Sequence, residues 1–90
     1  MKKILLTLAL LISFSSIGQT AEEYYNRGIS KAEAKDYYGA INDFNKVIEL
    51  NPRSAEAYYN RGLSKNNLKD YYGAISDYNK AIQLNPNDAG

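Results

Sequence analysis

The sequence predicts an all-α fold: a helix–turn–helix solenoid of two antiparallel helix pairs stacked one on the other, preceded by a helical signal peptide. Three observations predict it. Residues 21–54 recur as residues 55–88 with 23 of 34 positions identical, and such self-similarity indicates a repeat architecture. Within each unit the apolar residues return at intervals of three and four, which is the period of an amphipathic helix. Strand-like alternation of apolar and polar residues is absent.

The first 18 residues are typical of a signal peptide that is cleaved. Two lysines follow the initial Met, an apolar run covers residues 4–12, and Ser16 and Gly18 are small residues at the spacing that a signal peptidase accepts. Even residues 4–17 are too short for a membrane span, which needs about 20 apolar residues. We therefore expect cleavage before Gln19 and action in the periplasm, the cell envelope or the medium. An uncleaved anchor or a buried first helix is the alternative.

The composition excludes most enzyme chemistry. The chain has no Cys and no His, so it lacks disulfides, lipidated or nucleophilic cysteines, and the commonest general base and metal ligand. The net charge of +1 becomes −1 when Lys2 and Lys3 are removed (nine basic against ten acidic residues), which does not favour nucleic acid. Adjacent carboxylates such as Glu22 and Glu23 point apart on a helix. We expect no catalysis, no cofactor and no metal.

Each unit reads as two helices. In the first unit the apolar stripe predicts helices over residues 21–34 and 37–50. Pro52 and Pro86 follow the second helix of each unit, because the residue before a proline is pushed out of helical geometry. Side-chain oxygens that accept from the exposed amides of a first turn make good N-caps. The expected N-caps are Thr20, Asp36, Ser54 and Asp70.

Two glycines lie inside the first helices. Gly28 and Gly62 each cost about 1 kcal/mol relative to alanine at such a position. Close approach of a neighbouring helix is the physical reason for them. We expect Ala40 and Ala74 to form the opposite half of that contact.

A 34-residue unit of two helices resembles the tetratricopeptide repeat, whose pattern spaces an aromatic residue, a glycine, an alanine, a second aromatic residue and a proline. The resemblance covers residues 21–88 and implies a scaffold that binds proteins or peptides. Residues 89–90 then correspond to the start of a further repeat or cap. The matching positions are Tyr24, Gly28, Ala40, Phe44 and Pro52 in the first repeat and Tyr58, Gly62, Ala74, Tyr78 and Pro86 in the second.

Both repeats depart from that pattern in the same way. Arg27 and Arg61 stand where the family has Leu, and a lysine follows four residues later in place of Tyr. An aspartate lies at the same distance from each arginine, at Asp43 and Asp77. We predict an Arg–Asp pair between the two helices of each repeat, with the arginine stem packed on aromatic rings. A basic patch for an acidic ligand is the alternative.

The resemblance also implies where a partner binds, since the first helices of successive repeats line a concave groove. There the asparagines can grip a peptide backbone and the tyrosines offer rigid contact area. A merely solvated face is the alternative. A chaperone-clamp function is rejected, because the matching positions hold Tyr and Glu and not Lys and Arg. The predicted groove residues are Glu22, Tyr25, Asn26, Ile29, Glu33, Glu56, Tyr59, Asn60, Leu63 and Asn67.

The predicted function is therefore a non-catalytic scaffold for a protein or peptide partner. The nine tyrosines recur with the repeat, so we assign them to helix packing and not to the stacking of nucleic-acid bases. Solenoids usually need about three repeats, and two leave one apolar end uncovered. One alternative is that the sequence is the N-terminal part of a longer repeat protein with a further domain. The other is that the open end pairs with a second copy in a self-associating scaffold of the cell envelope.

Overall fold

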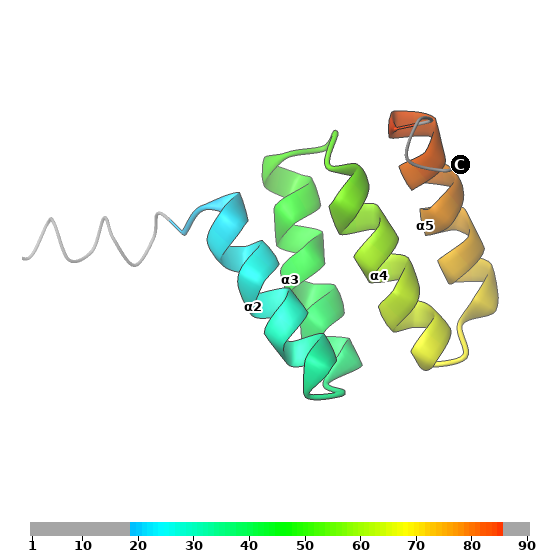
Figure 1. Cartoon of the computed structure of the whole chain (residues 1–90), viewed down its shortest axis with the longest axis horizontal. Helices are drawn as coiled ribbons and strands as arrows, with labels where there is room; N and C mark the ends of the chain where they lie inside the picture. The colour runs from blue at the N-terminus through cyan, green and yellow to red at the C-terminus, as the bar shows by residue number, and fades with distance from the viewer. Residues whose placement is uncertain (1–18, 86–90) are drawn as a thin grey trace, which may run out of the picture.

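Four helices make up the part of the protein that its computed structural model describes, residues 19–85. They are α2 (Ala21–Glu33), α3 (Tyr37–Leu50), α4 (Ala55–Asn67) and α5 (Tyr71–Leu84), drawn in Figure 1. Within residues 19–85 no strand occurs, so the predicted all-α fold of stacked helix pairs is confirmed. The predicted signal peptide (residues 1–18), Pro86 and the predicted start of a further repeat lie outside the described residues.

The helices begin at the predicted caps. The hydroxyl of Thr20 accepts from the backbone N–H of Glu23, whose carboxylate accepts in turn from the N–H of Thr20, so α2 opens with a capping box. Asp36, Ser54 and Asp70 each accept from the backbone N–H three residues on. These local bonds fix where the chain turns from one helix into the next.

The stack is bent toward its first helices. The helices of each pair, α2 with α3 and α4 with α5, pack along their lengths, and α4 also packs on α3. In addition α2 contacts α4, whereas α3 and α5 make no contact with each other. Because the first helices of the two pairs lie closer together than the second helices, we take the side formed by α2 and α4 as the concave one. We call it the concave side.

The core is small and is centred on Phe44, which is fully buried. A Cβ added to Gly28 would lie 2.8 Å from Cε1 of this ring. The absence of a side chain at Gly28 therefore leaves the space that the Phe44 ring fills. The three nearest atoms all belong to Phe44, so the expectation that Ala40 is the opposite half of the contact stays a prediction. For Gly62 the expectation holds in part, since the nearest atoms belong to the ring of Tyr78 and to the carbonyl oxygen of Ala74.

Candidate functional site

The cations of the first helices are turned toward the second helix of their own pair. The guanidinium of Arg61 donates to both carboxylate oxygens of Asp77, at 2.8 and 2.7 Å, and Lys65 reaches the same carboxylate at 3.1 Å. Arg27 makes the same bidentate pair with Asp43, at 3.0 and 2.8 Å. The predicted Arg–Asp pairs are confirmed, and each guanidinium also covers a tyrosine ring, with 5.2–5.3 Å between its central carbon and the ring centroid.

These pairs alter the acidity of the two aspartates. Hydrogen bonds from the Arg27 guanidinium hold the pKa of Asp43 below its usual range, with Lys31 adding to the effect. Burial alone raises the pKa of Asp77, but the bonds from Arg61 and Lys65 outweigh burial and lower it overall. Because internal carboxylates already hold these cations, the arrangement disfavours the alternative of a basic patch for an acidic ligand.

A polar cluster joins α2 to α4 on the concave side. The side-chain amide of Asn60 donates to the hydroxyl of Tyr25 and to the backbone oxygen of Glu56, both at 2.9 Å. The Tyr25 ring in turn tilts against Phe44 with 5.9 Å between centroids. Burial, and then the charge of Glu56, raise the pKa of the Tyr25 hydroxyl. The cluster therefore holds the two repeats in register.

This cluster corrects one part of the predicted groove. Both amide hydrogens of Asn60 are engaged within the protein, so its amide cannot also donate to a peptide, and the predicted paired grip is wrong for this residue. Its oxygen can still accept. Asn67 similarly donates to the backbone oxygen of Leu63, whereas Asn26 is exposed on α2.

The remaining predicted residues lie as a mixed polar and apolar surface on α2 and α4. The charged side chains and two of the three asparagines are exposed, and the aliphatic side chains are half-buried. The ten residues include three glutamates but neither Lys nor Arg. The exposed residues are Glu22, Asn26, Glu33, Glu56, Tyr59 and Asn67, and the half-buried ones are Tyr25, Ile29, Asn60 and Leu63.

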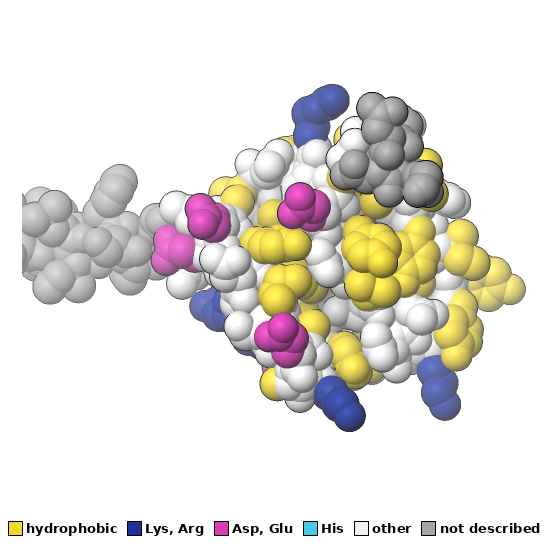
Figure 2. Space-filling view, in the orientation of Figure 1, with side chains coloured by type: hydrophobic (Ala, Val, Ile, Leu, Met, Phe, Trp, Pro, Cys, Tyr) yellow, Lys and Arg dark blue, Asp and Glu magenta, His cyan; other side chains and the backbone are white. Residues whose placement is uncertain are grey.

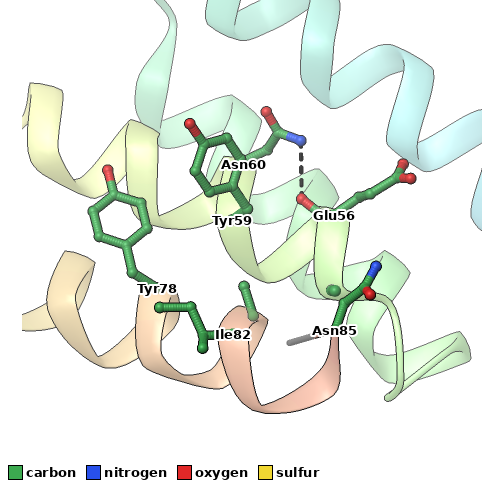
Figure 3. Close-up of a pocket in the computed structure, with 8 residues that line it drawn as sticks. Glu56, Tyr59, Asn60, Tyr78, Ile82 and Asn85 are labelled. Atoms are coloured by element: carbon green, nitrogen blue, oxygen red, sulfur yellow. Dashed lines mark hydrogen bonds between the residues drawn. The ribbon is translucent and has the colours of Figure 1, made fainter. Parts of the chain in front are cut away.

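A groove between α4 and α5 brings three of the predicted residues together (Figure 3). Glu56, Tyr59 and Asn60 line it from α4, with Tyr78 and Ile82 opposite them on α5. The rings of Tyr59 and Tyr78 are tilted against each other with 5.7 Å between centroids. Sequence reasoning missed the contribution of α5, because the resemblance places a ligand on first helices only.

The charges are distributed unevenly over the molecule. Figure 2 shows acidic side chains on the α2 side of a hydrophobic cluster that lies over α4 and α5, with Lys and Arg at the edges. Among residues 19–85 no group of three acidic, His or Cys side chains could hold a metal ion. None of helices α2 to α5 is long and apolar enough to span a membrane.

Comparison with known proteins identifies the repeats. Residues 30–69 match a family model described as TPR repeat, and residues 55–88 match one described as tetratricopeptide repeat. No curated protein matches the chain. The two models together cover residues 30–88, and the stacked helix pairs agree with them. The chain therefore belongs to the tetratricopeptide repeat family, whose repeats indicate a scaffold for protein–protein interaction.

Proposed function

We propose that the protein binds a positively charged, partly apolar segment of a protein partner along its concave side, outside the cytoplasm and without catalysis. One observation carries the proposal. Glu22 and Glu33 of α2 and Glu56 of α4 are exposed carboxylates, and Glu56 lines the same groove as the half-exposed ring of Tyr59. The arginines of these two helices are paired with Asp43 and Asp77.

The chemistry of this surface suits an extended segment. Tyr59 supplies a rigid ring for an apolar side chain, and the oxygens of Asn26 and Asn60 can accept from peptide N–H groups. Lysine or arginine side chains of the partner would lie near the three glutamates. Because exposed ion pairs contribute at most about 1 kcal/mol each, we expect weak binding that falls as salt is added.

A synthetic peptide of alternating lysine and leucine is a direct probe for this surface. We expect it to shift the backbone amide NMR signals of α2 and α4, and added salt to reverse the shifts. Changing Glu22, Glu33 and Glu56 together to Gln should weaken binding about tenfold, since three exposed pairs are lost. The matched control is Glu49→Gln, at an exposed carboxylate on α3 that pairs with Lys46.

Two outcomes would contradict the proposal. One is equal binding of a peptide in which glutamate replaces every lysine, because the carboxylates would then play no part in selecting the partner. The other is unchanged binding by the triple variant, which would place the peptide elsewhere on the molecule.

Export is the second part of the proposal and rests on the leader pattern of residues 1–18. We expect intact-mass measurement of the native protein to find a chain that begins at Gln19 in the envelope or medium fraction. A chain that retains its first residues and stays with the cytoplasmic fraction would contradict it. Because the peptide titration does not depend on location, the two parts of the proposal fail separately.

A further inference from the structure

The last helix pair exposes the counterpart of a face that the first pair buries. In the first repeat, Phe44 and Val47 are buried beneath α4, at 0% and 3% exposure. Their counterparts in the second repeat are only half-buried, and Ile82 is 48% exposed. We call this surface the open face, formed by Tyr59, Ile75, Tyr78, Ala81 and Ile82.

The helix that covers the first repeat shows what fits such a face. Ala57 and Ser64 of α4 are buried in the contact, at 0% and 1% exposure. Two hydrogen bonds cross it. The amide of Asn60 donates to the Tyr25 hydroxyl at 2.9 Å, and Arg61 donates to the side-chain oxygen of Asn45 at 2.8 Å. Small residues thus admit the helix, and two polar contacts set its register.

The same donors and acceptors recur, uncovered, at the two ends of the molecule. On α2 the counterparts of the two donors are Asn26 and Arg27, both exposed, and Ser30 stands at the place of Ser64. On the second repeat the counterparts of the two acceptors are Tyr59 and Asn79, also exposed. The Arg27 side chain is 47% exposed, compared with 19% for Arg61, because within residues 19–85 no helix pair precedes α2 as the first pair precedes α4.

We propose that α2 of one copy docks on the open face of a second copy, head to tail, in the register that α4 adopts on the first repeat. Asn26 then donates to the partner's Tyr59 hydroxyl, and Arg27 donates to the partner's Asn79. The assignment rests on the interface between α4 and the first repeat. Of the four residues that α4 places in that interface, three recur at the same repeat positions in α2, as Asn26, Arg27 and Ser30.

The fourth position limits the strength of the contact. Glu23 stands where α4 has Ala57, and its carboxylate closes the capping box with Thr20. Docking covers the stem of Glu23 and brings its charge to the edge of an apolar contact, which is unfavourable. The association between copies is therefore weaker than the contact within one chain.

A head-to-tail contact joins two different surfaces, so it generates a chain or a ring of copies and not a two-fold dimer. Each added copy extends the concave side by two repeats. A short two-repeat surface would thereby become a longer one, on which several copies could hold one partner.

Failure of self-association would leave the proposed peptide binding intact, because a single copy carries Glu22, Glu33 and Glu56.

Sedimentation over a concentration series tests the inference on the protein as recovered from its host. We expect the average mass to rise without a plateau at two copies. Glu23→Ala should tighten association about tenfold, because it removes the charge that docking brings to the edge of the apolar contact. Ile82→Glu on the open face and Ser30→Arg on α2 should each abolish association. The matched control is Tyr38→Glu, at a ring that is 73% exposed even though α4 covers its repeat.

The decisive experiment mixes the Ile82→Glu variant, whose open face is blocked, with the Ser30→Arg variant, whose α2 is blocked. Each retains one intact end, so a head-to-tail contact predicts a complex of one Ile82→Glu chain with one Ser30→Arg chain, although neither associates alone. The complex also proves that both variants are folded. Association of Ser30→Arg by itself would show that open faces pair with each other and would overturn the inference. A monomeric native protein together with a monomeric Glu23→Ala variant would overturn it as well.

Discussion

Replacing Phe44 with alanine is expected to lower the free energy of unfolding by about 3–5 kcal/mol, the usual cost of truncating a buried aromatic residue. Phe44 is the largest fully buried side chain among residues 19–85, and it fills the space that Gly28 leaves open. The other buried apolar residues are Val47 and three alanines. A chain of this size has a total stability of about 3–10 kcal/mol, so the expected loss is a large fraction of the whole.

The second repeat supplies the matched control for this prediction. Tyr78 occupies the position of Phe44, faces Gly62 in the same way and is only half-buried. Tyr78→Ala should therefore cost about half as much, since half-exposed apolar area contributes less when it is removed. Urea unfolding followed by circular dichroism measures the loss in the free energy of unfolding for both variants. Equal losses in the two variants would show that the core is not centred on the first repeat.

The helices and their ends could be predicted from the sequence because their causes are local. Thr20, Asp36, Ser54 and Asp70 act within three residues of their own position, so a single stretch of sequence contains the whole interaction. The turns are less predictable. Lys35 and Lys69 take the left-handed conformation, with φ of 67° and 68°, at a place where glycine is the usual residue.

The ion pairs could also be predicted, because a fixed separation of 16 residues joins each arginine to its aspartate in both repeats. By contrast, the bond from Asn60 to Tyr25 joins two different repeats. It depends on how α4 sits on α2, and that placement is set by packing and not by any local pattern. The sequence therefore identified Asn60 as a groove residue but could not show that its donors are already engaged.

The groove between α4 and α5 was missed for a related reason. Ile82 and Ile48 are the same residue at the same position of the repeat, so the residue type does not distinguish a covered position from an open one. The repeat count predicted an uncovered apolar end, but not that residues of α5 line a groove with α4 there. Only the stack shows that the second pair has no helix on this side within residues 19–85. Comparing the two repeats for exposure, and not for identity, is what reveals the open face.

Replacing Asp77 with alanine is the second change from which we expect a large effect. The carboxylate is 3% exposed and accepts from Arg61 and Lys65, so its loss leaves two cations without their partner. Removing one partner of a buried pair costs about 3–5 kcal/mol. Because the two cations keep about a fifth of their surface exposed, water compensates in part, and we expect a loss of about 2–3 kcal/mol.

Asp43→Ala is the matched variant. It breaks the same pair in the first repeat, where Arg27 keeps nearly half of its side chain exposed, so its loss should be smaller. A double-mutant cycle of Arg61→Ala with Asp77→Ala should give a coupling free energy clearly above zero. If the cycle showed no coupling, the cost of Asp77→Ala would have to be assigned to packing and not to the ion pair.

Acidification provides an independent test of the same pairs. The pKa values of Asp43 and Asp77 are lowered in the folded protein, so their stabilisation is complete above the ordinary carboxyl pKa of about 4. It is lost as the pH falls through the lowered values, where the folded state must also take up protons. Urea midpoints of the native protein should therefore drop in acid, and those of Asp77→Ala should drop less, because the variant has already lost one of the two groups. Parallel losses in both proteins would mean that Asp77 is not the group that titrates.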